Sequence, residues 1–111
     1  MVLILDDALE RSNKLTSFAI SRWNEVPLWF ASSNSFMEYL KQDVNRFYKA
    51  FMLDHDLGLD EPTGLDVVKF IIENNIKVEE IVVHSVNPEG SKRMVELLTE
   101  HGYKALKIMP F

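Results

Sequence analysis

The chain has 111 residues, of which 47% are hydrophobic and 26% charged, and its formal net charge is −5. This composition is typical of one folded domain, and the negative charge excludes an extended nucleic-acid footprint, which requires clustered Lys and Arg. The absence of cysteine excludes disulfides and thiolate metal sites. No apolar run reaches the roughly 20 residues that a membrane span needs, and Asp6 and Asp7 interrupt the first run. We therefore expect a cytoplasmic protein without membrane contact.

Short apolar runs alternate along the chain with longer segments of helical period. Runs of consecutive apolar residues predict strands that are covered on both faces, as in a parallel sheet. The predicted strands are Val2–Leu5, Leu28–Ala31, Ala50–Leu53, Ile81–Val83 and Ala105–Met109. Between them, four groups of apolar residues each share one helical face. These groups are Leu15, Phe18, Ala19 and Trp23; Phe36, Leu40, Val44 and Phe47; Leu65, Val68 and Ile72; and Met94, Val95 and Leu98.

Capping residues mark the predicted helix ends. Three pairs have the spacing of a capping box, namely Asp7 with Glu10, Ser35 with Glu38 and Thr63 with Asp66. Asn87 before Pro88 is typical of an N-cap, and Gly102 of a left-handed C-terminal cap. Strands joined by crossover helices run parallel, with right-handed connections. We therefore predict an α/β domain built on a five-stranded, doubly wound parallel sheet.

Polar residues are concentrated directly after the predicted strands. The strands of such a sheet deliver their carboxyl ends to one edge, where ligands bind. Helix caps and solvated loops explain several of these residues singly. They do not explain why Asp54 and Asp56 flank His55 directly after an apolar strand, so we expect one functional cluster. Its members are Asp6-Asp7, Ser32-Ser33-Asn34, Asp54-His55-Asp56 and His84-Ser85-Val86-Asn87.

The carboxylates of this cluster predict a cation site. Carboxylates that lie close together either raise each other's pKa or bind a cation. Oxygen ligands suit Mg²⁺, which takes one or two carboxylates together with waters and phosphate oxygens. Two His with an Asp could instead bind Zn²⁺, Mn²⁺ or Fe²⁺, and this remains the alternative.

The cluster resembles the acidic pocket of two-component response-regulator receiver domains, and the resemblance covers residues 1–111 as a single domain. It implies a receiver or flavodoxin-like (βα)5 fold with strand order 2-1-3-4-5. It also implies that Asp7 and Asp54 ligate Mg²⁺ directly and that Asp6 acts through water. Ser85 would then contact a phosphoryl group.

The chain departs from receivers at the end of the fifth strand, where they carry a Lys directly before a Pro. Here Met109 precedes Pro110, and Lys107 lies one layer deeper on the same face. We therefore expect a metal ion alone to supply positive charge to the site. We also expect that Asp54 does not run a receiver-type phosphorylation switch.

Three further motifs resemble a receiver-derived group described as cyclic-phosphate-processing receiver domains. They are Asp54-His55-Asp56-Leu57-Gly58, His84-Ser85-Val86-Asn87-Pro88 and Thr63-Gly64-Leu65-Asp66. That group is proposed, from sequence comparison, to act on cyclic phosphate ends. The resemblance implies a metal-assisted phosphoesterase for a phosphate-containing small molecule or a nucleic-acid end.

Hydrolysis of a cyclic phosphate needs a base to activate water and an acid to protonate the departing hydroxyl. His55 and His84 could supply both if they face each other across a shared pocket. With Asp54 they are the predicted catalytic residues. The predicted substrate contacts are Ser85, Asn87, Asp56 and Gly58. A stand-alone signalling receiver and a silent phosphate or nucleotide binder remain the alternatives, and no obligate protein partner is evident.

Overall fold

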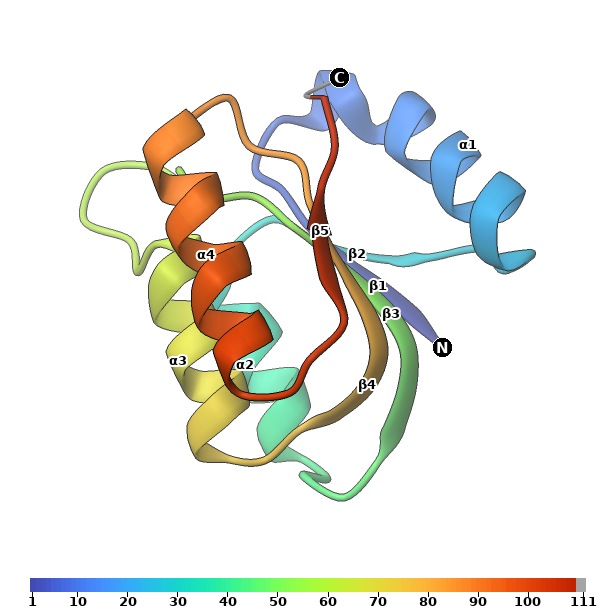
Figure 1. Ribbon diagram of the computed structural model, residues 1–111. Coiled ribbons are helices and arrows are strands. Elements are labelled where there is room, and N and C mark those ends of the chain that lie inside the picture. Colours follow the sequence, from blue (N-terminus) through green and yellow to red (C-terminus); the bar gives the residue numbers. More distant parts are fainter. Residues whose placement is uncertain (110–111) are drawn as a thin grey trace.

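The computed structural model describes residues 1–109, and its central feature is a parallel five-stranded sheet (Figure 1). The strands lie in the order β2-β1-β3-β4-β5, which confirms the predicted doubly wound sheet and its strand order. Their bounds are β1 Val2–Leu5, β2 Leu28–Phe30, β3 Phe47–Leu53, β4 Lys77–Val83 and β5 Ala105–Lys107. Strands β3 and β4 begin earlier than predicted, because their first residues alternate exposed with less exposed side chains. Pro110 and Phe111 lie outside the described residues.

Helices cover both faces of the sheet. Helix α1 covers one face, and α2, α3 and α4 cover the other (Figure 1). Within residues 1–109, the four α-helices are α1 Ser12–Trp23, α2 Ser33–Lys41, α3 Gly64–Glu73 and α4 Pro88–Glu100, with a short 3-10 turn, η1, at Leu9–Arg11. The fifth helix of a (βα)5 pattern is not among these residues. None of the helices in this range is long and apolar enough to cross a bilayer.

The strands are apolar at consecutive positions because each face packs into its own core. On the side of α2, α3 and α4, the buried strand residues are Leu3, Leu5, Tyr48, Phe51, Leu53, Ile81 and Val83. On the side of α1, they are Val2, Ile4, Ala50, Met52 and Val82. Alternate residues of a strand point to opposite faces, so the two cores share the same three strands.

The predicted helix starts are correct for the last two helices. Thr63 and Asp66 form a complete capping box at α3. The Asn87 side chain accepts a hydrogen bond from the Gly90 amide at 2.9 Å and so caps α4. Gly102 follows α4 with φ +85°, which is the left-handed conformation that was predicted.

The predicted starts of the first two helices are wrong. Asp7 and Glu10 form no capping box, because η1 intervenes and α1 begins only at Ser12. The cap of α2 is Ser32, whose Oγ accepts from the Ser35 amide at 3.1 Å, so Ser35 lies inside the helix.

The end of α2 also differs from the prediction. This helix stops at Lys41, so Val44 and Phe47 do not share its apolar face. Phe47 instead begins β3, where its side chain is exposed.

A buried carboxylate ties α1 to the sheet. Glu80 of β4 accepts from Arg22 Nε at 2.8 Å and Nη2 at 2.7 Å, and from Trp23 Nε1 at 2.9 Å. Lys104 Nζ lies 3.3 Å from its second oxygen. The hydrogen bonds from Arg22, with those from Trp23 and Lys104, outweigh the effect of burial and lower the pKa of Glu80 to about 2.

Candidate functional site

The ends of three central strands bring the main site residues together. Asp6, Asp54 and His84 each follow directly on β1, β3 and β4, whose last residues pair in register. The ladder continues by one residue, since the Asp54 amide donates to Leu5 O at 3.0 Å and the His84 amide to Leu53 O at 3.1 Å. Their side chains therefore meet at the carboxyl edge, as expected for a doubly wound sheet.

The predicted acidic cluster is present at this edge. Each of Asp6, Asp7 and Asp54 offers a carboxylate oxygen, and these oxygens lie within 4.8 Å of one another. Asp6 and Asp54 are buried, whereas Asp7 is exposed. Three carboxylates at this separation form a concentrated negative charge that is partly shielded from water.

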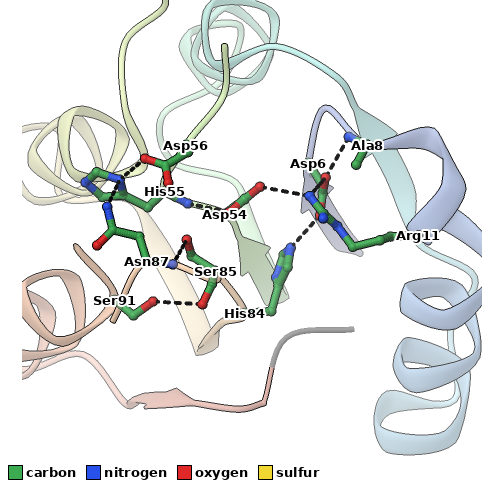
Figure 2. Close-up of polar contacts among 10 residues, drawn as sticks. All are labelled: Asp6, Ala8, Arg11, Asp54, His55, Asp56, His84, Ser85, Asn87 and Ser91. Carbon is green, nitrogen blue, oxygen red and sulfur yellow. Dashed lines mark hydrogen bonds and ion pairs between the residues drawn. The ribbon is translucent and has the colours of Figure 1, made fainter. Parts of the chain in front are cut away.

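Asp6 is held by four hydrogen bonds (Figure 2). Its Oδ1 accepts from the Ala8 amide at 2.7 Å and Arg11 Nη2 at 2.8 Å, and its Oδ2 from Arg11 Nε at 2.9 Å and His84 Nε2 at 2.9 Å. Burial alone would raise its pKa, but the hydrogen bonds from His84, Arg11 and Ala8 lower the pKa of Asp6 to about 2. Both oxygens of Asp6 are thus already used by donors within the protein.

Asp54 accepts fewer hydrogen bonds than Asp6, and Ser85 is a further hydrogen-bond partner of its side chain. Its Oδ1 accepts from the His55 amide at 2.8 Å, and its Oδ2 lies 3.3 Å from Arg11 Nη2. Burial, followed by the negative charge of Asp6, raises the pKa of Asp54. Asp54 and the exposed Asp7 therefore have more capacity for a further ligand than Asp6 does.

Arg11 is the site residue that the sequence analysis missed. Its guanidinium lies between Asp6 and Asp54 (Figure 2), so the expectation that a metal ion alone would supply positive charge is wrong. Lys107 is exposed. The sequence signal that could have identified Arg11 is an Arg in the connection that follows Asp6-Asp7. The predicted cap at Asp7 implied that a regular α-helix begins there. In the structure, the short 3-10 turn η1 comes first and places the Arg11 side chain against Asp6.

The two histidines do not face each other. The side chain of His84 is fully buried, its Nε2 contacts Asp6, and its Nδ1 has no hydrogen-bond partner among the described residues. The His55 ring lies on the other side of Asp54 (Figure 2). Its Nδ1 is 2.7 Å from Asp56 Oδ1 and 3.4 Å from Asn87 Nδ2. The two rings contact different carboxylates, so the arrangement across one pocket in which both could act as acid and base is not formed.

Two glycines allow backbone segments to approach His55 and Asp54 closely. A Cβ at Gly90 would lie 2.6 Å from His55 Cδ2, so the imidazole packs directly on the first turn of α4. A Cβ at Gly64 would lie 2.1 Å from the carbonyl oxygen of Asp54, and the Gly64 amide donates to His55 O at 2.8 Å. The start of α3 thus holds the backbone of the Asp54-His55 segment.

Among the predicted substrate contacts, Ser85 lies beside Asn87 and Gly58 lies beside Asp7. Ser85 is buried, and its Oγ accepts from the Asn87 amide at 3.1 Å. Gly58 has φ +104°, and a Cβ there would lie 3.9 Å from Asp7 Oδ2, so this loop runs beside the acidic cluster.

The loop after β2 is less involved in the site than expected. Ser32 caps α2, and Asn34 Nδ2 lies 3.4 Å from Glu61 Oε2. Within residues 1–109, none of the hydrogen bonds to the site carboxylates comes from the Ser32-Ser33-Asn34 segment.

Several solved structures with a similar fold are response regulators or receiver domains. A response regulator from Colwellia psychrerythraea aligns with TM-score 0.67 and 16% identity, over 96% of this chain and 79% of that chain. A CheY-like receiver protein from Methanospirillum hungatei aligns with TM-score 0.63 and 21% identity, over 99% and 82%. The receiver domain of a histidine kinase from Arabidopsis thaliana, solved with Mg²⁺ and BeF₃⁻, aligns with TM-score 0.63 and 14% identity, over 96% of this chain and 78% of that chain. The fold is therefore that of a receiver domain.

The family within this class follows from the sequence. The family model described as the cyclic-phosphate processing receiver domain matches residues 1–100. The chain belongs to this family. None of the curated proteins matches it.

Proposed function

We propose that this domain is a metal-assisted phosphoesterase that opens a cyclic phosphate at the carboxyl edge of its sheet. The observation that carries the proposal is the cluster of Asp6, Asp7 and Asp54, with oxygens within 4.8 Å, beside the oriented imidazole of His55. An acidic cluster next to an acid–base group suits hydrolysis of a phosphate ester when a cation offsets the charge.

The donor set fits a divalent cation such as Mg²⁺. We propose Asp7 and Asp54 as direct ligands, because the oxygens of Asp6 already accept four hydrogen bonds. A zinc site built on both histidines is less well supported, since one nitrogen of each ring already contacts a carboxylate. When bound, the cation neutralises charge on the phosphate oxygens.

His55 is the proposed acid–base residue. Its Nδ1 lies 2.7 Å from the Asp56 carboxylate, which favours the tautomer with the proton on Nδ1 and leaves Nε2 as a proton acceptor. Nε2 would take a proton from water as the water oxygen bonds to phosphorus. One phosphorus–ribose oxygen bond then breaks, and the departing oxygen takes a proton from solvent. The product is a phosphate monoester.

We propose a different role for His84 from the one predicted for it. Its ring is fully buried and its Nε2 donates to Asp6, so it has no access to substrate water. His84 would act as a positioning residue, because it fixes Asp6 beside Asp54. Replacing it is expected to change metal affinity as well as turnover.

Turnover of defined cyclic phosphates tests the proposal. The substrates are 2′,3′-cyclic nucleotides, RNA with a 2′,3′-cyclic end and 3′,5′-cyclic nucleotides, each with Mg²⁺ or Mn²⁺. A general acid–base group contributes about 10²–10⁴-fold, so His55→Ala is expected to lose most of the turnover. Asp54→Asn is expected to lose both turnover and metal binding, the latter measured by calorimetry.

His101→Ala is the matched control. His101 is an exposed imidazole at the other end of α4, where its Nδ1 lies 2.9 Å from Leu97 O. Its replacement is expected to leave turnover unchanged. Absence of turnover on every substrate and metal would refute the phosphoesterase proposal and favour a binding or signalling module.

A signalling function is the second candidate, and Asp54 is the observation that favours it. This Asp directly follows β3 of a receiver fold, and one of the similar receiver domains was solved with Mg²⁺ and BeF₃⁻. We still expect Asp54 not to run a switch. Incubation with acetyl phosphate, followed by mass spectrometry and amide NMR, tests this. Stoichiometric modification of Asp54 with shifts that spread along α4 would restore the signalling function.

A further inference from the structure

Arg11 combines a fixed position with an incompletely used guanidinium. Its Nε and Nη2 donate to the two oxygens of Asp6 at 2.9 and 2.8 Å, which is the bidentate geometry of a strong Arg–carboxylate pair. The same Nη2 lies 3.3 Å from Asp54 Oδ2. This third contact is longer than the other two, so it is the one that a better acceptor can replace.

The partner of Arg11 cannot easily move. Asp6 is fully buried, and the Ala8 amide and His84 hold it in addition to Arg11. Because the guanidinium is planar and rigid, the fork on Asp6 also fixes the remaining N–H groups of Arg11. Within residues 1–109, Nη1 makes no hydrogen bond, and the side chain is 25% exposed. Arg11 therefore offers donors to a ligand beside Asp54.

The charges of the cluster give Arg11 a function beyond pairing with Asp6. Asp6, Asp7 and Asp54 carry three negative charges when ionised, and Arg11 contributes one positive charge. A divalent cation would bring the cluster to neutrality only if Arg11 is counted. Without Arg11, a phosphate would meet a net negative site even with the cation bound, and the partly buried setting strengthens that repulsion.

We propose that Arg11 is the phosphate-binding residue of the site. Asp6 holds the guanidinium in place, and an N–H that now lies near Asp54 donates to an oxygen of the bound phosphate. This inference rests on the proposed function, since it concerns a phosphate at the same edge, and it adds the group that recognises the anion. The competing interpretation is that Arg11 only neutralises a buried carboxylate.

The chain contains a matched control for that competing interpretation. Arg22 makes the same two-pronged contact, through Nε and Nη2, with the buried Glu80. Arg22 lies at the opposite end of α1 from Arg11, about 16 Å away along the helix axis. Arg22→Gln thus removes an equivalent ion pair without touching the acidic cluster.

Binding of inorganic phosphate decides between the two interpretations. The titrations use calorimetry and phosphorus NMR, with the full chain in saturating Mg²⁺, and circular dichroism checks that each variant is folded. Loss of a charge-assisted hydrogen bond is expected to weaken phosphate binding about 10–100-fold in Arg11→Gln. Affinity for Mg²⁺ is expected to stay equal or increase, because a nearby positive charge is removed. Arg22→Gln is expected to bind both as the parent does.

Arg11→Lys covers the case in which Arg11→Gln does not fold. It keeps the charge but loses the planar fork, so phosphate binding is expected to fall between the parent and Arg11→Gln. Parent-like phosphate affinity in a folded Arg11 variant would overturn the inference, and so would absence of phosphate binding by the parent. Turnover of cyclic phosphates is scored separately. Arg11-dependent phosphate binding without turnover would support the inference and refute the phosphoesterase.

Discussion

Replacing Glu80 by glutamine removes a buried charge whose contribution to stability depends on pH. The side chain is nearly inaccessible and accepts from Arg22 and Trp23, with Lys104 close by. These contacts lower its pKa from the usual 4.5 to about 2. One pKa unit is worth about 1.4 kcal/mol, so the difference corresponds to about 3 kcal/mol of unfolding free energy.

The sign of this effect follows from the protonation of the two states. The folded pKa of Glu80 is below the unfolded one, so the stabilisation is fully present above about pH 4.5 and is lost as the pH falls towards about 2. The parent is therefore expected to exceed Glu80→Gln in stability most at neutral pH. The gap between the two proteins should narrow by up to about 3 kcal/mol on acidification.

Urea unfolding at a series of pH values measures the difference in unfolding free energy between the parent and Glu80→Gln. Other acidic groups titrate in both proteins alike, so the difference isolates Glu80. A gap that stays constant from about pH 6 to about pH 2 would show that the pKa of Glu80 is not lowered, and the reasoning would be wrong.

Four further substitutions test the site and its supports. Gly64→Ala is expected to destabilise the fold by about 3 kcal/mol, measured by urea unfolding. The Cβ of the new alanine would lie 2.1 Å from the carbonyl oxygen of Asp54, and the backbone would have to shift to relieve this clash. Gly90→Ala is expected to keep the fold in circular dichroism but to displace the His55 ring, seen as changed imidazole shifts in NMR and reduced turnover. Asn87→Ala is expected to cost about 1 kcal/mol in thermal unfolding, through loss of the α4 cap. Mg²⁺ is expected to raise the melting temperature of the parent more than that of Asp54→Asn, and equal shifts would remove Asp54 from the metal site.

The fold could be predicted from the sequence because the patterns that indicate its strands and helix ends are local. Runs such as Val2–Leu5 are apolar at every position, and in the structure alternate residues enter the two cores. The caps at Thr63 and Asn87 could be read because both partners of each hydrogen bond lie within a few residues. The false cap at Asp7 has the same spacing, but the competing contact of Asp6 with Arg11 is absent from any local pattern.

The composition of the site was predicted better than its geometry. The position of Asp6, Asp54 and His84 at one edge follows from parallel strands that end in register. Which way the rings of His55 and His84 turn depends on tertiary contacts, with Gly90 on one side and Asp6 on the other. Arg11 was missed for the same reason, because a single turn of 3-10 helix decides where its long side chain lies.

Asn87 belongs to a helix end and to the site at the same time. Its Oδ1 accepts from the Gly90 amide, and its Nδ2 lies 3.4 Å from His55 Nδ1. Fraying of the first turn of α4 breaks the Asn87–Gly90 cap and also removes Gly90 from the His55 ring that packs on it, while the contact of His55 with Asp56 does not depend on this turn. Local openings of this kind are measured by amide hydrogen exchange. The exchange rate at Gly90 therefore reports how often the packing surface for the His55 ring opens.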